Sequence, residues 1–266
     1  MTTAPNIRTV KLTLAYEGTA YVGWQRQTNG PSIQAALESA VRDVEGGPVT
    51  LVGAGRTDAG VHALGQVASV RLTNPIPTDA LGRALNATLP RDIRVVAAEE
   101  APAAFHARFD AATKEYRYRL LHGTVASPFE SRYGWFVGGP LDHDRMAEAA
   151  RALVGEHDFA AFQAAGSDTA TTVRIVHALT VRRSPPEATP GGVSWGQPLS
   201  LVDIRGSGFL RHMVRIIVGT LVEVGRGRRP PGAVGEALRS RDRAAAGPTA
   251  PGHGLFLVRV EYPSGA

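Results

Sequence analysis

Hydrophobic and polar positions alternate along several stretches of the first half of the chain, which is typical of half-buried strands. Between Val10 and Tyr16, apolar side chains occupy every second position, with Lys11 and Thr13 between them. Two other stretches repeat their apolar positions with helical spacing, and the first of these opens with a potential N-cap at Ser32. The predicted elements of this half are strands over residues 10–16, 49–55, 65–72 and 92–101 and helices over residues 32–41 and 78–87.

The second half of the chain repeats this alternation of strands and helices with different residues. Its predicted elements are strands over residues 114–121, 172–183, 199–206 and 254–262 and helices over residues 142–155 and 209–225. In each half, strands mix with helices that cover one face, so the fold class is α+β. We expect two domains, residues 1–110 and 111–266, and an exposed hairpin loop in the Pro- and Gly-rich stretch 184–192.

Composition narrows the classes of protein to which the chain can belong. With 43% hydrophobic and 20% charged residues, the 266-residue chain is predicted to fold rather than to be disordered. It has no cysteine, which excludes disulfides, thiolate metal sites and a cysteine nucleophile. The N-terminus lacks an apolar targeting region and no window approaches about 18 uninterrupted apolar residues. We therefore expect a cytoplasmic protein with no membrane partner.

The net charge of +5 is unevenly distributed along the chain. From Arg205 to Arg243 there are nine arginines against three acidic residues, Glu223, Glu236 and Asp242. Such a segment favours a polyanionic partner, because arginines displace the counterions that condense on phosphates. A solvated helix face would carry the same charges. Composition leaves both interpretations open.

The stretch GAGRTDAGVHALGQ, residues 53–66, places Asp58 among glycines between two predicted strands. One interpretation is a tight turn in which an Asp or Thr side chain bonds its own backbone. The other is a displayed catalytic carboxylate, with glycines that let a ligand approach the backbone closely. The nearby His62 is either a structural residue or a phosphate contact. No HExxH motif, Walker A loop or Rossmann glycine motif appears, so we predict no metal and no nucleotide cofactor.

The predicted helix 209–225 carries basic residues on an otherwise apolar surface. Arg211 lies where this helix is predicted to begin and can reach solvent or phosphate. Arg215, one turn further, is crowded by apolar neighbours, so it needs a carboxylate partner if it is buried. It can also extend along the surface to reach solvent.

The predicted strand 114–121 contains the sequence KEYRYRL, in which basic and aromatic residues interleave. Lys114, Tyr116 and Tyr118 project from one face of this strand, and Arg117 and Arg119 project from the other. Tyrosines at this spacing are common half-buried sheet residues. Basic residues beside aromatics also form platforms on which an unstacked base can lie.

Several motifs, in this order and spacing, resemble the TruA family of tRNA pseudouridine synthases over nearly the whole chain. The matching stretches are GRTDAGVHALGQV at 55–67, FHAR at 105–108, KEYRY at 114–118, HDFAAF at 157–162, FLRHMVRIIVG at 209–219 and AGPTAPGHGLFLVRVEY at 246–262. The resemblance implies the pseudouridine-synthase fold, with two halves of mixed or antiparallel sheets flanked by helices around a central cleft. It also implies isomerisation of uridine to pseudouridine at tRNA positions 38, 39 and 40 in the anticodon arm, a homodimer and no cofactor.

The resemblance also implies roles for individual residues. Asp58 matches the nucleophilic aspartate, Arg215 the arginine paired with it, Tyr116 the tyrosine that packs on the target base, and Arg56 an arginine associated with the flipped nucleotide. We add Arg211 and His62 as expected substrate contacts. The reaction moves the glycosidic bond from N1 to C5 without losing the base, so a nucleophile must hold one fragment while the other turns. Attack at C1′ and addition at C6 both fit a carboxylate.

Three other functions fit parts of the sequence. A non-catalytic tRNA-binding protein or folding chaperone would keep the basic and aromatic segments but would not need Asp58, Tyr116 and Arg215 together. A uridine isomerase acting at another RNA site would carry the same residues, because shape and phosphate contacts determine such specificity. A glycosidase would want a second carboxylate near Asp58, and no motif supplies one.

Overall fold

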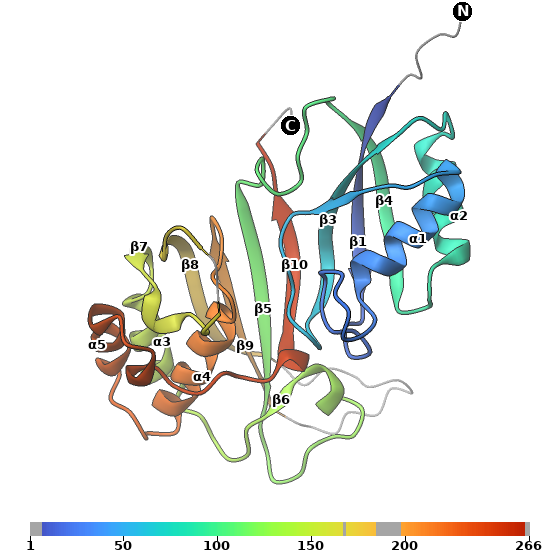
Figure 1. Ribbon diagram of the computed structural model, residues 1–266. Helices are drawn as coiled ribbons and strands as arrows, with labels where there is room; N and C mark the ends of the chain where they lie inside the picture. Colours follow the sequence, from blue (N-terminus) through green and yellow to red (C-terminus); the bar gives the residue numbers. More distant parts are fainter. Residues whose placement is uncertain (1–6, 167–168, 185–197, 264–266) are drawn as a thin grey trace, which may run out of the picture. The chain divides into compact units, whose positions relative to one another are not determined.

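The chain folds into two compact units in a computed structural model that describes residues 7–166, 169–184 and 198–263 (Figure 1). The first unit contains residues 7–112 and 257–263, and the second contains the described residues of 113–256. Residues 257–263 group with the first unit, although the sequence placed them in the second domain. Hydrogen bonds to the first unit explain this grouping, because the Ala112 N–H donates to the Glu261 carbonyl at 2.8 Å and the Tyr262 hydroxyl donates to the Ala107 carbonyl at 2.7 Å.

The sheet of the first unit has the strand order β4-β1-β3-β10, with β2 beside β3. Its strands are β1 (Arg8–Tyr16), β2 (Leu51–Gly53), β3 (His62–Leu72), β4 (Ile93–Ala101) and β10 (Leu255–Glu261). The central β1 pairs antiparallel with both β3 and β4. The alternation of apolar residues in β1 predicts one buried face, and Val10, Leu12 and Leu14 on that face are fully buried.

Two amphipathic helices, α1 (Ile33–Glu45) and α2 (Thr78–Thr88), lie side by side against the sheet of the first unit (Figure 1). The predicted cap is confirmed, because the Ser32 side chain accepts a hydrogen bond from the Ala35 N–H. At its other end, α1 closes on Gly46 in the left-handed conformation, with φ of 78°. The first turns of helix α1 contact the segment that precedes the Asp58 loop, through the bond from the Gln34 side chain to the Leu51 carbonyl. This helix therefore helps to position the candidate site described in the next subsection.

The strands of the second unit continue the same ten-stranded sheet in the order β5-β9-β8-β7, with a short β6 beside β5. Its strands are β5 (Thr113–Leu121), β6 (Trp135–Phe136), β7 (Gly155–Asp158), β8 (Val173–Ser184) and β9 (Leu199–Gly206). β5 pairs antiparallel with β9, as do β9 with β8 and β8 with β7, whereas β6 runs parallel to β5. Strands of both orientations mixed with helices confirm the α+β class. The loop predicted between residues 184 and 192 lies almost wholly outside the described residues.

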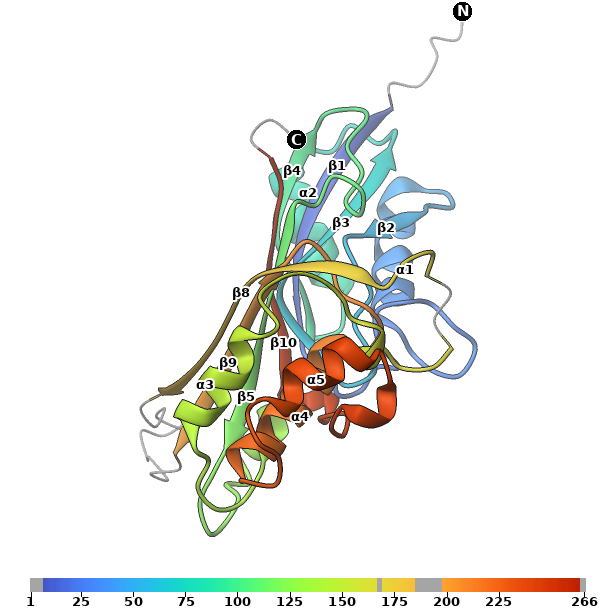
Figure 2. The ribbon, with the colours of Figure 1, turned by 90° about the vertical axis from the view of Figure 1, so that its left-hand side faces the viewer.

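Helices α3 (His143–Arg151), α4 (Met213–Gly225) and α5 (Ala233–Ser240) gather on one side of the strands of the second unit (Figure 2). The sequence extended α3 to residue 155, but the chain leaves the helix after Arg151 and enters β7 at Gly155, whose φ of 114° is unsuited to a helix. Neither β6, β7 nor α5 was predicted. No helix in the described ranges is long and apolar enough to cross a membrane.

Helix α4 begins four residues later than predicted. His212 adopts the left-handed conformation with φ of 59°, which breaks the helical path before Met213. The preceding Arg211 is held outside the helix, because its carbonyl accepts from the Ala164 N–H and its Nη1 donates to the carbonyls of Ala165 and Gly166, each at 3.1 Å. Long-range bonds to this loop therefore replace the first helical turn that periodicity predicted.

Two histidines meet at a buried hydroxyl in the second unit. Arg183 Nε donates to His143 Nδ1 at 3.2 Å, so the proton of a neutral His143 lies on Nε2, which faces Ser200 Oγ. Ser200 Oγ is 2.6 Å from His122 Nε2, and its hydroxyl can donate a hydrogen bond to that nitrogen. Burial, the neighbouring His143 and Arg183 together lower the pKa of His122 to about 4, and burial also lowers the pKa of His143.

This histidine pair predicts acid sensitivity of folding. Between pH 6.5 and 4 the unfolded chain binds protons at these positions that the folded chain does not bind, so stability falls as pH falls. For His122 alone the loss across that window is about 3 kcal/mol, given its lowered pKa. Urea unfolding at pH 7, 6 and 5 measures the slope, which should flatten in His122→Gln and stay unchanged in His177→Gln, at an exposed histidine of β8. An unchanged slope in His122→Gln would contradict the assignment.

Candidate active site

The Asp58 loop of the first unit is a tight turn with its carboxylate at the end of a sheet. The Val61 N–H donates to the Asp58 carbonyl at 3.1 Å, and Gly60 adopts a φ of 73° that a side chain would disfavour. Asp58 itself is half-buried and Ala59 is exposed. The turn interpretation and the display of a carboxylate are therefore both compatible with this geometry, because the same turn presents the Asp58 side chain.

A second segment, residues 23–24, supports this loop from the side. Gly23 forms an isolated antiparallel bridge with Asp58, and the Trp24 N–H donates to the Thr57 carbonyl at 3.0 Å. Gly23 has a φ of 110°, and a Cβ added there would lie 2.5 Å from the Thr57 carbonyl oxygen. Only glycine therefore permits this close approach of the two backbones. Sequence reasoning missed Gly23, although its place in the run GWQRQ was a visible signal.

Side chains beneath the loop hold it from the other side. The Tyr16 hydroxyl lies 2.8 Å from Thr57 Oγ1, and Gln66 Nε2 donates to the Gly55 carbonyl at 3.0 Å. Tyr16 is only 4% exposed, and this burial raises its pKa to about 12, so it is a neutral hydroxyl at physiological pH. The carboxylate of Asp58 is thus carried on a loop whose backbone is bonded on two sides.

His62 lies beneath the neighbouring loop rather than on the surface. It is 1% exposed, and its Nδ1 accepts a hydrogen bond from the Gly18 N–H at 3.0 Å. Since Nδ1 accepts, the ring is neutral and its 3.5 Å approach to Glu17 Oε1 is not an ion pair. This burial favours the structural interpretation of His62 over a phosphate contact. It joins residues 17–18 to the segment that follows Asp58.

Arg56, two residues before Asp58, is exposed at the surface of the first unit. Its Nε donates to Gln25 Oε1 at 3.1 Å. The four N–H groups on its two terminal nitrogens make no further hydrogen bond within the described residues, and they have the geometry that binds a phosphate. The loop therefore presents an arginine and a carboxylate two residues apart.

In the second unit, Tyr116 occupies the middle of the sheet. It lies on β5 opposite Ile204 of β9, is 7% exposed, and meets the edge of the Phe209 ring with centroids 5.3 Å apart. Phe209 comes from the segment that leads into α4, so this aromatic contact links the KEYRY strand to the FLRHMVR segment. Its neighbour Tyr118 is fully buried and donates to the Pro251 carbonyl at 2.8 Å.

Arg215 lies in the first turn of α4 and is tied to the segment 246–252. Its Nε donates to the Ala250 carbonyl at 2.7 Å, and its own carbonyl accepts from the Ala250 N–H at 3.1 Å. The two elements are in close contact, because a Cβ on Gly219 would lie 1.8 Å from the Pro248 carbonyl oxygen. Sequence reasoning considered a carboxylate or solvent for this guanidinium and missed the backbone carbonyl. The bond fixes the direction of the Arg215 side chain.

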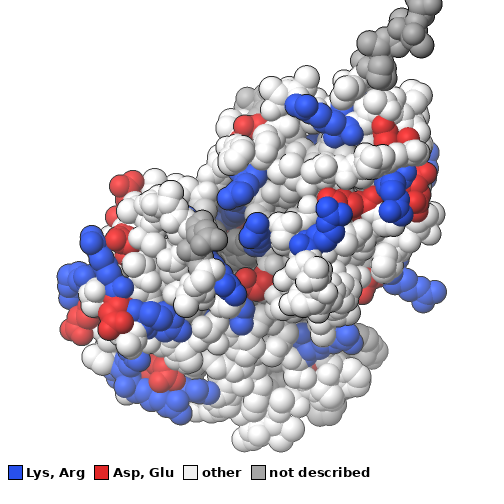
Figure 3. All heavy atoms as spheres, in the orientation of Figure 1, with Lys and Arg blue, Asp and Glu red and all other residues white. Residues whose placement is uncertain are grey.

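Much of the arginine excess between residues 205 and 243 takes part in the fold. Arg226, Arg229 and Arg243 each donate to backbone carbonyls, as Arg211 and Arg215 do. Arg228 pairs with Glu223. Figure 3 shows acidic side chains interspersed with basic ones over the α3–α5 part of the second unit. Part of the arginine excess therefore stabilises the fold. The number of arginines in this segment overstates the positive charge that is available to a polyanion.

The predicted site residues are distributed over both units. Arg56, Asp58 and His62 belong to one loop region of the first unit, and Tyr116, Arg211 and Arg215 belong to the second. No group of three His, Asp or Glu side chains suited to a metal ion occurs in the ranges that the structure describes.

Comparison with known proteins agrees with the motifs. The model of a family described as tRNA pseudouridine synthase matches residues 13–110 and 149–263. A protein named tRNA pseudouridine synthase A from Syntrophotalea carbinolica is 49% identical over 95% of this chain and 96% of its own length. Proteins of the same name from Geotalea uraniireducens and Myxococcus xanthus are 46% and 47% identical, over 96% of this chain and 100% and 92% of their own.

A solved structure with a more distant likeness is the crystal structure of a Cbf5-Nop10-Gar1 complex. One of its chains is 13% identical, with a TM-score of 0.36, and the likeness covers 93% of this chain and 48% of that chain. This chain thus spans about half of that chain, and a likeness so distant supports no inference about function.

Proposed function

Because this chain belongs to the tRNA pseudouridine synthase family, we propose that it isomerises uridine to pseudouridine at positions 38, 39 and 40 of the tRNA anticodon stem-loop. The chain is an isomerase of tRNA uridine. What we propose is which positions of the tRNA it modifies. The observation that supports it best is the Asp58 loop, in which a half-buried carboxylate and an exposed arginine lie two residues apart on a loop that is bonded to Gly23, Tyr16 and Gln66.

We assign the nucleophilic role to Asp58. Its carboxylate bonds to C1′ or to C6 of the nucleotide, the N1–C1′ bond breaks, the uracil ring turns, C5 bonds to C1′, and the carboxylate is released. The proton leaves C5 and N1 gains one, so the atoms of substrate and product are the same. Attack at C1′ and addition at C6 both use this carboxylate. In either route the loop must hold the carboxylate still, and its bonds to Gly23 and Tyr16 supply that rigidity.

The remaining site residues have binding roles in this proposal. The uridine must leave the base stack before Asp58 can reach it, at a cost of a few kcal/mol. Tyr116 packs on the target base, Arg56 contacts the flipped nucleotide, and Arg215 is assigned as the arginine paired with the nucleophile. Arg211 retains an exposed position, but its Nη1 already bonds two carbonyls, so it contributes less to RNA binding than the sequence suggested.

We also propose that the enzyme acts in the cytoplasm as a homodimer and without a cofactor. A tRNA arm is longer than one half of the chain, so a second subunit extends the surface that orients it. Gel filtration at micromolar protein should give about twice the mass of the 28.1 kDa chain. A monomeric mass would contradict the homodimer but not the reaction.

Position-resolved pseudouridine formation in unmodified tRNA transcripts tests the proposed function. Transcripts with a single uridine at position 38, 39 or 40, and cytidine at the other two, separate the three sites. We expect product in each and none in a transcript with cytidine at all three. Product at a uridine elsewhere would change the assigned positions, and tight binding without product would favour a non-catalytic tRNA chaperone.

A further inference from the structure

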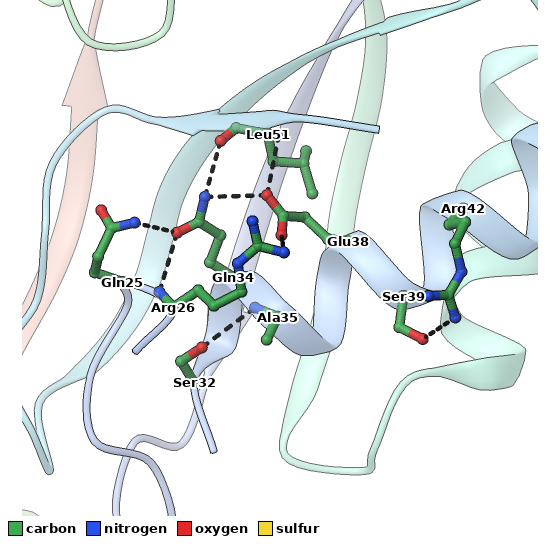
Figure 4. A network of polar contacts seen from close by, with 9 residues as sticks. All are labelled: Gln25, Arg26, Ser32, Gln34, Ala35, Glu38, Ser39, Arg42 and Leu51. Atoms are coloured by element: carbon green, nitrogen blue, oxygen red, sulfur yellow. Dashed lines mark hydrogen bonds and ion pairs between the residues drawn. The ribbon is translucent and has the colours of Figure 1, made fainter. Parts of the chain in front are cut away.

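A chain of hydrogen bonds runs from a buried carboxylate in α1 to the exposed Arg56. Glu38 and Gln34 lie one turn apart on this helix and are 7% and 8% exposed. Gln34 Nε2 donates to Glu38 Oε1 at 3.1 Å and to the Leu51 carbonyl at 3.1 Å. Gln34 Oε1 accepts from Gln25 Nε2 at 2.7 Å, and Figure 4 shows these side chains in line beside Leu51.

Backbone groups determine the direction of every bond in this chain. The Leu51 carbonyl can only accept and the Arg26 N–H, 3.1 Å from Gln34 Oε1, can only donate. The amide of Gln34 therefore has one orientation, with its oxygen toward Gln25. Gln25 must therefore donate to Gln34 Oε1 through its NH₂ group, so its own oxygen accepts a hydrogen bond from Arg56 Nε at 3.1 Å.

A salt bridge keeps the inner end of the chain in place. Arg26 Nη1 lies 3.0 Å from Glu38 Oε2, and the Leu51 N–H donates to Glu38 Oε1 at 3.4 Å. Gln34 thus uses both amide hydrogens and both lone pairs of its oxygen, a fully satisfied arrangement that resists rotation of the side chain. The exposed arginine is held by a buried network, whereas most surface arginines sample many rotamers.

We propose that Gln25 is a positioning residue for the isomerisation, with Gln34 and Glu38 fixing the orientation of its amide. The proposal rests on the proposed function and extends it, because Arg56 is the residue assigned to the flipped nucleotide. With Nε bonded to Gln25, the guanidinium presents its terminal nitrogens as a fork suited to a phosphate or ribose oxygen. The network thereby removes the entropic cost of ordering Arg56 when RNA binds.

A double-mutant cycle on single-uridine tRNA transcripts tests this role. Gln25→Met keeps the length of the side chain but has no hydrogen-bonding oxygen, and it should lower kcat/KM about tenfold. Arg56→Ala should lower kcat/KM by more, and adding Gln25→Met to it should cause no further loss. The matched control is Gln27→Ala, an exposed residue of the same segment that bonds the Val22 carbonyl and should leave kcat/KM unchanged. Multiplicative effects, or wild-type kinetics in Gln25→Met, would overturn the proposal.

A second measurement separates this proposal from the proposed function. The Nε–H resonance of Arg56 in ¹⁵N-labelled protein reports the bond to Gln25 without any RNA. It should exchange slowly with solvent in the wild-type chain and fast in Gln25→Met, with Gln27→Ala like wild type. Fast exchange in the wild type would contradict the positioning role even if the enzyme is active. Slow exchange in an enzyme that makes no pseudouridine would leave the bond in place and refute the function.

Discussion

Replacing Asp58 with alanine is expected to lower pseudouridine formation by about a thousandfold or more while tRNA binding persists. A nucleophile has no substitute among the side chains of its own loop, because Arg56, Thr57 and His62 are a cation, a hydroxyl bonded to Tyr16 and a buried neutral ring. Asp58→Asn should be equally inactive, since the amide keeps the shape and loses the charge. Single-turnover assays with excess enzyme measure the chemical step apart from product release.

The control for this substitution is Asp43→Ala, which removes an exposed carboxylate of α1 that pairs with its neighbour Arg42. Its activity should match the wild type. Filter binding should show that the wild type and all three variants bind tRNA with similar affinity, because phosphate contacts supply most of that affinity. Residual activity of Asp58→Ala within tenfold of the wild type would exclude Asp58 as the nucleophile.

Gly23→Ala is the second substitution with a large expected effect. The added methyl group would lie 2.5 Å from the Thr57 carbonyl oxygen and 3.0 Å from the Asp58 carbonyl carbon, so the backbone of the Asp58 loop has to move. A displacement of about 1 Å in a catalytic group costs about 100-fold in rate. We expect a loss of that size in kcat/KM, together with a loss of a few kcal/mol in the free energy of unfolding.

Gly46→Ala provides the matched control. Gly46 also has a positive φ, 78°, but beyond its chain neighbours no atom of the described residues contacts the position that its Cβ would take within 4 Å. Its substitution should cost only the strain of a left-handed alanine, about 1 kcal/mol, and leave kcat/KM unchanged. Urea unfolding and initial rates on the same samples compare the two variants. Equal activity of both would mean that the approach of Gly23 to Thr57 is not needed for catalysis.

Elements that depend on local pattern were predicted well. Strand β1 follows from the alternation of Val10, Leu12 and Leu14, because a strand with one buried face needs nothing more than that period. Helix α1 follows from its apolar stripe and the Ser32 cap, both of which act within a few residues. The family motifs indicated Asp58, Tyr116 and Arg215, whose roles stay proposals until they are tested.

Errors arose where a distant segment competes with a local preference. Periodicity extended α4 back to Phe209, but the carbonyls of Ala165 and Gly166 hold Arg211 outside the helix. Periodicity also left the partner of Arg215 open, and a backbone carbonyl from the segment 246–252 binds it. Such carbonyls carry no sequence signal, because every residue has one.

The residue types of the candidate site could therefore be read from the chain, because a carboxylate, an arginine and a tyrosine in long motifs are written in the sequence. The contacts that surround these residues could not be read from the chain. The burial of His62 under Gly18, the close approach of Gly23 to Thr57 and the support of Arg56 by Gln25 all join residues that lie many positions apart. Contacts of this kind form only when strands and helices pack, since they depend on the distance between backbones and on which polar groups packing leaves to be paired.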